Sequence, residues 1–245
     1  MSDKKLPIYI KGRRAEIPMN RESEFFCPNS DNSPKELSWR ILKIQSEFVK
    51  GHDFLREYKK AVSIFGSARD GLDESVYKEA EKLAWYLARE GFAVFTGGGP
   101  GIMEAANKGA KEAGGRSVGI NIKLPATDGS TERRNKYVTE AESFDFFFTR
   151  KVILSFASQF YIAFPGGYGT MDELFQMLTL VQTGKSSPIP IILVNKEFWG
   201  PLVDWIKTTM LEKNHTISEK DLDLFHLFDN ADEVYEFIKT TIEEG

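Results

Sequence analysis

The sequence contains a single cysteine, Cys27, and only three histidines. One cysteine excludes an internal disulfide bond and a cysteine-built metal site. The histidines share no ligand spacing with one another or with Cys27, so we predict no metal ion. A serine-based nucleophile elbow and a cysteine–histidine nucleophile pair are also missing, which argues against those forms of covalent catalysis.

Long apolar runs and an excess of positive charge are absent as well. No run approaches the roughly 20 apolar residues that are needed to cross a bilayer. The formal net charge is −4, so nothing draws the chain to nucleic acid or to an anionic membrane. The first eighteen residues lack the apolar centre and the cleavage site of a secretory signal. We therefore expect a cytoplasmic protein that binds neither nucleic acid nor membrane.

From residue 61 onward, short apolar runs alternate with stretches of helical pattern. The runs cover residues 61–65, 92–95, 117–120, 160–164 and 189–194. Continuous apolar strands joined by helices are typical of a parallel sheet, because right-handed crossovers place helices on each face. The pattern predicts an α/β fold, a Rossmann-like doubly wound parallel sheet with helices on both faces.

The first 34 residues differ from the rest of the chain. They contain four prolines, scattered charge and no steady hydrophobic period, which favours a flexible N-terminal arm over residues 1–34. Ser33 and Pro34 are typical of a helix start, and the apolar residues behind them recur at helical spacing. We therefore predict a single α/β nucleotide-binding domain over residues 35–245, led by a long helix.

The most informative glycine-rich turn joins a buried strand to a helix predicted over residues 171–182. Its sequence is Pro165-Gly166-Gly167-Tyr168-Gly169-Thr170. Glycines let backbone N–H groups approach a ligand, and a helix N-terminus offers unpaired donors with partial positive charge. The turn therefore predicts a phosphate site. The alternative is a tight turn that needs glycine only for its backbone angles.

A second glycine-rich turn, Gly97-Gly98-Gly99-Pro100-Gly101, opens a helix predicted over residues 102–113. It lacks the dinucleotide-binding fingerprint, because Ile102 stands where the third glycine belongs. The strand that follows does not end in an acidic residue able to bind a ribose 2′-hydroxyl. An NAD(P)-dependent enzyme is therefore disfavoured.

Several charged residues have two interpretations. Thr170 and Glu173 have the spacing of a helix capping box, yet the same spacing holds a carboxylate one turn above the phosphate turn, within reach of a ribose. Arg150 and Lys151 interrupt an apolar segment and need partners there. A structural salt bridge and recognition of a phosphate or carboxylate both meet that need. Arg69, after the glycine turn at residue 66, raises the same question.

Three segments in this order resemble the LONELY GUY (LOG) family of cytokinin-activating phosphoribohydrolases, in its longer bacterial branch. The segments are residues 97–105, Arg150-Lys151 and residues 165–173, and the resemblance extends over residues 61–238. The resemblance implies hydrolysis of the N-glycosidic bond of AMP or of N6-modified (cytokinin) riboside 5′-monophosphates. The products would be the free base and ribose 5-phosphate, and no cofactor is implied.

The resemblance also implies the roles of individual residues. Glu173 would stabilise oxocarbenium-like charge at C1′ and help a water molecule attack, as carboxylates do in glycoside cleavage. Arg150 matches the essential arginine of the family and would orient the substrate. Glu132 is the candidate for an acidic residue that members place upstream of this arginine. The implied substrate-binding set is Gly98, Gly99, Glu132, Lys151, Gly166, Gly167, Tyr168, Gly169 and Thr170.

Members of the family are dimers or hexamers built from dimers, so the implied partners are a nucleoside monophosphate and a second copy of the chain. The family is often misnamed as lysine decarboxylases, but no lysine here stands in a recognisable context for pyridoxal phosphate. Phe146, Phe147 and Phe148 replace smaller, polar residues of plant members, which leaves the identity of the base open. The alternative function is a non-catalytic nucleotide or cofactor carrier, which has no reason to pair Arg150 with Glu173.

Overall fold

The computed structural model describes residues 7–10, 13–16, 34–69, 71–123 and 134–244. The chain divides into two units, residues 1–46 and 47–245. In the first unit, β1 (Pro7–Ile10) pairs antiparallel with β2 (Arg13–Glu16). Both strands lie inside the segment for which the sequence shows no strand pattern. The helix α1 (Pro34–Leu55) begins in the first unit and ends in the second.

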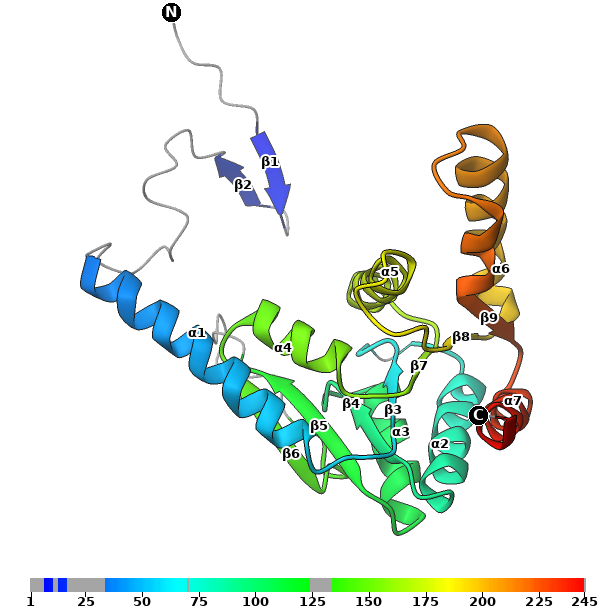
Figure 1. The fold of residues 1–245 in the computed structure, drawn as a ribbon, viewed down its shortest axis with the longest axis horizontal. Helices are drawn as coiled ribbons and strands as arrows, with labels where there is room; N and C mark the ends of the chain where they lie inside the picture. The colour runs from blue at the N-terminus through cyan, green and yellow to red at the C-terminus, as the bar shows by residue number, and fades with distance from the viewer. Residues whose placement is uncertain (1–6, 11–12, 17–33, 70, 124–133, 245) are drawn as a thin grey trace, which may run out of the picture. The chain divides into compact units, whose positions relative to one another are not determined.

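In the described part of the second unit, seven strands form one sheet in the order β6-β5-β4-β3-β7-β8-β9 (Figure 1). Every neighbouring pair is parallel. The strands are β3 (Ala61–Phe65), β4 (Ala93–Thr96), β5 (Ser117–Ile122), β6 (Glu140–Phe144), β7 (Phe160–Ala163), β8 (Ile191–Val194) and β9 (Phe225–Phe228). The chain winds from β3 to one edge, returns to β7 beside β3, and winds to the other edge. The predicted doubly wound parallel sheet is confirmed.

Helices cover both faces of this sheet (Figure 1). One face packs against α2 (Glu74–Arg89), α3 (Ile102–Glu112) and α7 (Ala231–Glu244). The other face packs against the end of α1, α4 (Phe147–Ser155), α5 (Tyr168–Gln182) and α6 (Lys196–Trp205). The π-helix η1 (Ile206–Lys213) continues α6, and the 3-10 helix η2 (Glu219–Leu224) precedes β9. No helix among the described residues is long and apolar enough to cross a membrane.

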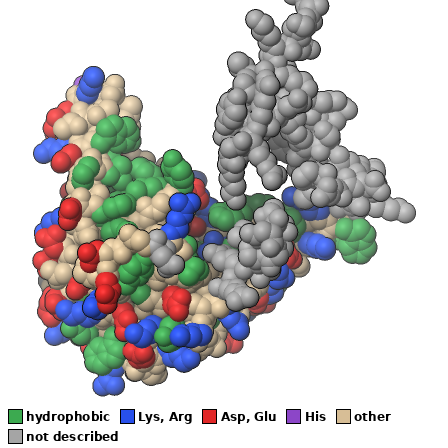
Figure 2. Space-filling view, turned by 180° about the vertical axis from the view of Figure 1, so that it is seen from behind, with side chains coloured by type: hydrophobic (Ala, Val, Ile, Leu, Met, Phe, Trp, Pro, Cys, Tyr) green, Lys and Arg blue, Asp and Glu red, His purple; other side chains and the backbone are tan. Residues whose placement is uncertain are grey.

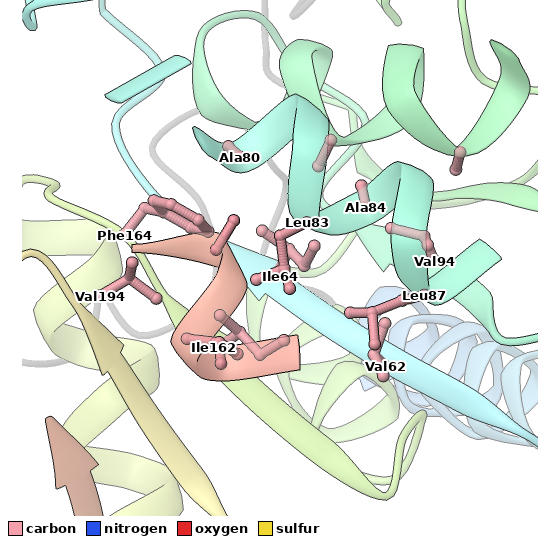
Figure 3. Close-up of a cluster of buried hydrophobic side chains, with 14 of the residues drawn as sticks. Val62, Ile64, Ala80, Leu83, Ala84, Leu87, Val94, Ile162, Phe164 and Val194 are labelled. Carbon is pink, nitrogen blue, oxygen red and sulfur yellow. The ribbon is translucent and has the colours of Figure 1, made fainter. Parts of the chain in front are cut away.

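The central strand β3 is held by side chains that alternate between the two faces. Val62 and Ile64 point to the α2 side, where Leu83 and Leu87 pack on them, and all four are fully buried (Figure 3). Each such side chain contributes about 1.5–3 kcal/mol on burial. Ser63 points to the opposite face, since successive strand residues alternate, and its hydroxyl bonds to that of Ser158 at 2.7 Å. This packing fixes the position of β3, and the turn that follows β3 lines the candidate site.

The edge strands β6 and β9 are not among the strands predicted from the sequence. β6 contains two glutamates, and four of its five residues are only partly buried. β9 is partly buried along its whole length. An edge strand pairs on one side only and faces solvent, so it does not need the continuous apolar run of a central strand.

Candidate functional site

The candidate site lies where the winding of the sheet changes direction, between β3 and β7. In sheets of this kind, ligands bind at the carboxyl ends of the strands at such a point. A cavity of about 600 Å³ opens there, which is in the range of ligand-binding clefts. It is lined by Gly66, Ser67, Ala68, Arg69, Met103, Ile122, Phe147, Arg150, Gly166, Gly167, Tyr168, Gly169, Thr170, Met171 and Glu173.

Backbone hydrogen bonds tie the turns around the cavity to one another. The Ser67 N–H donates to the Pro165 carbonyl at 3.0 Å, and the Ile102 N–H donates to the Ser67 carbonyl at 2.9 Å. Gly101 has φ of 70° and caps α3. A Cβ at Gly101 would lie 2.2 Å from the Ser67 carbonyl oxygen, so only glycine allows this approach. The turns after β3, β4 and β7 therefore form one connected wall.

The turn before α5 depends on Gly166. A Cβ at this position would lie 2.0 Å from the Thr170 hydroxyl oxygen, so glycine lets the first turn of the helix close against the preceding loop. The helix begins at Tyr168 with Gly167 as its N-cap, and no side chain caps it. Unpaired first-turn amides and the helix dipole favour an anion at such a helix start. Residues 166–170 of this turn line the cavity, at a place suited to an anion.

The capping-box interpretation of Thr170 and Glu173 is wrong. Because Gly166 allows the chain to enter the helix at Tyr168, Thr170 is the third helical residue rather than the N-cap. Glu173 lies nearly a full turn further along α5. Its side chain is therefore available for a role other than capping.

Glu173 is buried, with 7% of its surface exposed. Apolar and aromatic side chains surround it, among them Phe65, Tyr161 and Met177, which line a small void beside it. Burial raises the pKa of Glu173 to about 7; the Arg150 charge opposes this increase, as does that of Lys151. Near neutral pH this carboxyl group can therefore both bind and release a proton.

Arg150 approaches the same cavity from α4. Its side chain is buried, and its Nε donates to the Ile120 carbonyl at 2.8 Å. A Cβ at Gly97 would lie 2.3 Å from Nη2 of Arg150, so the guanidinium packs directly on the Gly97 backbone. The second glycine-rich turn thus supports the arginine. The two residues predicted to be catalytic, Arg150 and Glu173, line one cavity.

Lys151 does not line the cavity. Its ammonium forms an ion pair with Asp172 at 2.6 Å, which corresponds to the structural alternative that the sequence left open. Asp172 precedes Glu173 in the chain, and the Lys151 charge lowers the pKa of Glu173. Its predicted contact with substrate stays a prediction.

Gly98 and Gly99 also lie outside the cavity lining. Asn135 Nδ2 donates to their carbonyl groups, at 3.2 Å and 2.9 Å, and the Gly98 N–H donates to Thr96 Oγ1 at 2.9 Å. The amide of Gly98 is therefore engaged within the protein. Glu132, the other predicted substrate-binding residue, lies outside the described residues.

The turn after β3 contributes lining residues that the sequence did not assign to the site, Gly66, Ser67 and Ala68. Arg69 in the same turn was considered only as an open question. The available signal was the position of this turn after the first strand of the alternation, but the strand order was needed to place it opposite the phosphate turn. Phe147, from the aromatic segment expected near the base, also lines the cavity and is half exposed.

Within the described ranges, no group of three or more His, Cys, Asp or Glu side chains is placed to hold a metal ion. The cavity instead combines glycine-rich backbone, arginine and one buried carboxyl group. Such a set can bind an anion and act on an adjacent bond by proton transfer and charge stabilisation.

Comparison with known proteins supports the resemblance. A family model described as "Possible lysine decarboxylase" matches residues 103–238, more than half of the chain. The chain is 27% identical over 159 residues to the cytokinin riboside 5′-monophosphate phosphoribohydrolase of Rhodococcoides fascians, covering 64% of this chain and 79% of that protein. It is 26% identical over 166 residues to an Arabidopsis thaliana protein with the same activity in its name, covering 67% and 75%.

Two solved structures have the same fold. The molybdenum cofactor binding protein of Rippkaea orientalis aligns with a TM-score of 0.57 and 24% identity, covering 75% of this chain and 98% of that chain. The molybdenum cofactor carrier protein of Chlamydomonas reinhardtii aligns with a TM-score of 0.56 and 22% identity, covering 76% and 99%. At these identities the likeness establishes the fold alone. From the family match and the named relatives, we conclude that the chain belongs to the LONELY GUY family, the family described as possible lysine decarboxylase.

Proposed function

We propose that the protein hydrolyses the N-glycosidic bond of AMP or of N6-modified adenosine 5′-monophosphates, producing the free base and ribose 5-phosphate. The observation that carries the proposal is that Glu173 and Arg150 line one cavity beside a glycine-rich helix start. A carrier requires an anion site, but it has no need for a buried carboxyl group with a pKa near 7. The names of the relatives support the same reaction.

The 5′-phosphate binds at the start of α5. Neither Gly167 nor Gly169 has a neighbour within 4 Å of the place where a Cβ would lie, so a ligand can approach the backbone closely there. Arg69, on the opposite turn, is exposed and lines the same cavity. Its guanidinium supplies a second attraction for a phosphate, for which arginine has the matching donor geometry.

The ribose then lies next to Glu173. As the bond between C1′ and the base nitrogen breaks, its electron pair leaves with the base and positive charge develops at C1′. The ionised carboxylate stabilises this charge and accepts a proton from the water whose oxygen bonds to C1′. The proton that Glu173 takes from the water then passes to the departing base, which restores the carboxylate. Arg150 balances the negative charges of phosphate and carboxylate.

The base occupies the apolar part of the cavity. Met103, Ile122 and Phe147 line it, and an adenine ring or an N6-prenyl group is complementary to such a surface. Because these side chains bind by shape and stacking rather than by hydrogen bonds, we propose that plain and prenylated adenine are both accepted.

Two features of the surface support a proposal for the partners. Exposed aromatic side chains on and beside α4 and α5 are Phe147, Phe148, Phe156, Tyr168 and Phe175. We propose that a second copy of the chain covers this aromatic surface, since exposed apolar patches mark interfaces. On the face shown in Figure 2, acidic and basic side chains are interspersed. Several charged side chains are paired, as Lys82 is with Asp232. Such a face offers no continuous positive field for nucleic acid.

A substrate panel tests the reaction. The protein is incubated with AMP, with isopentenyladenosine 5′-monophosphate and with adenosine, and the free base is separated and measured. We expect base from both monophosphates and little from adenosine, which lacks the phosphate. Tight binding of AMP without release of base would instead support the carrier function.

A further inference from the structure

The helix that carries Arg150 has no cap of its own. α4 contains only nine residues, its N-cap is Phe146, and no side chain of that residue caps it. The first amides of any helix lack intrahelical partners and must be satisfied in another way. Arg150 is the fourth residue of α4, so the position of the helix start bears directly on the guanidinium.

Glu47 of α1, about 100 residues earlier in the chain, binds the segment that leads into α4. Its carboxylate accepts from the Asp145 N–H at 2.5 Å and from the Phe146 N–H at 3.4 Å. The hydroxyl of Thr149, which is fully buried and adjacent to Arg150, also donates to it. Glu47 itself is 6% exposed. A negative charge at a helix N-terminus is favourable because it faces the positive end of the dipole.

The next turn of α1 reinforces the same contact. A Cβ at Gly51 would lie 2.5 Å from Cγ1 of Ile153, so α1 and α4 touch closely at this glycine. Lys50 donates to the Ser143 carbonyl at 2.7 Å and pairs with Glu142 at 2.9 Å. The end of α1 therefore braces the segment from β6 into α4.

The guanidinium has little room to adapt if α4 shifts. Its Nε is bonded to the Ile120 carbonyl and its Nη2 packs on Gly97. We propose that Glu47 is a positioning residue: by binding the N–H groups that lead into α4 and the Thr149 hydroxyl, it holds Arg150 in the orientation that the site requires. Glu47 does not line the cavity, so its effect passes through α4. The kinetic part of this inference rests on the proposed function.

The test compares Glu47→Gln with Glu79→Gln. Glu79 of α2 is a matched control, because its carboxylate also binds a backbone N–H at the start of another helix, that of Ala231 in α7, at 2.6 Å. Glutamine keeps the size of the side chain but presents an NH₂ group to donors. With AMP, at a temperature where all variants are folded, we expect Glu47→Gln to lower kcat about tenfold or more with KM changed less than about twofold. Glu79→Gln should keep the wild-type kcat.

A double variant and an exchange measurement separate positioning from simple loss of stability. Glu47→Gln should cause no further loss of kcat when Arg150 is already replaced by Ala, because both changes act through one group. By NMR, the Arg150 Nε–H should exchange with water faster in Glu47→Gln than in the wild type and in Glu79→Gln. Unchanged kcat and unchanged exchange in Glu47→Gln would overturn the inference. If the wild type releases no base, the proposed function fails, and the exchange rate of this N–H still decides the inference.

Discussion

Glu173 is unusual among the acidic residues that the structure describes, because burial, not pairing, dominates the shift of its pKa. Burial raises its pKa to about 7, and the Arg150 and Lys151 charges only partly oppose the increase. By contrast, Glu140 forms a hydrogen bond with the Arg116 guanidinium, and this bond lowers the pKa of Glu140. Strongly perturbed groups inside clefts are frequent at functional sites. We therefore expect the burial of Glu173 to favour proton transfer and, when the carboxyl group ionises, to lower the stability of the fold.

A pH-dependent cost to stability follows. The folded state holds the Glu173 proton more tightly than the unfolded chain, whose carboxyl has the ordinary pKa of 4.5. The resulting stabilisation is complete below pH 4.5 and is lost as the pH rises through about 7. Glu173→Gln has no carboxyl group to titrate at this position, so it does not lose this stabilisation. We expect the unfolding free energy of the variant minus that of the wild type to be roughly 3 kcal/mol larger at pH 8 than at pH 4. Urea unfolding at both pH values measures it, and an equal difference at both would contradict the burial argument.

At the scale of the element, the start of α5 determines which groups face the cavity. Gly166 and Gly167 are adjacent, yet only Gly166 has no room for a side chain, because of Thr170. Gly167 has φ of −94°, which any residue adopts. The first glycine is thus needed for packing within the turn, and the second leaves open space above the helix.

Alanine substitution should separate these two glycines. Gly166→Ala forces a methyl group into the Thr170 side chain and should lower the unfolding free energy by about 1–3 kcal/mol, the usual cost of overpacking. Gly167→Ala should change it by less than about 0.5 kcal/mol, as at open surface positions. Chemical denaturation of both variants provides the comparison. Equal losses would show that the close approach to Thr170 does not determine the turn.

Some strands and helix boundaries could be predicted from the sequence, and others could not. The central strands were predicted because buried parallel strands are continuously apolar, whereas the partly buried edge strands β6 and β9 carry no such signal. Residues 166–170 were predicted as site residues and line the cavity, but the helix start was placed three residues late, at residue 171 instead of Tyr168. Its true start depends on the approach of Gly166 to Thr170, a three-dimensional contact that propensity does not encode.

At the scale of the whole molecule, the order of the strands in the sheet brings the two sides of the site together. The turn after β3 faces the turn after β7 because the winding changes direction between these two strands. The sequence predicted both turns but not their adjacency, so Ser67 and its neighbours were not assigned to the cavity. Conversely, Gly98 and Gly99 were assigned from the resemblance, whereas their carbonyl groups bind Asn135 and they lie outside the lining.

The proposed homodimer is a second property of the whole molecule. Sedimentation at micromolar concentration should give twice the 27.8 kDa of one chain. Phe148→Glu should shift the mass toward one chain, because Phe148 is 48% exposed in the aromatic surface beside the cavity. Trp85→Glu, on α2 and 41% exposed, is the matched control and should leave the mass unchanged. A wild-type protein that sediments as a monomer would contradict the dimer.

The most direct test of the proposed reaction measures AMP binding and ribose 5-phosphate release in the same preparations of wild type and Glu173→Gln. We expect both proteins to bind AMP with similar affinity, since the glycine-rich turn before α5 is intact in each. We expect turnover by the wild type and a loss of about 100-fold or more in kcat for Glu173→Gln, the usual contribution of a catalytic acid or base. Binding without turnover by the wild type, or equal turnover by the two proteins, would contradict the proposed reaction.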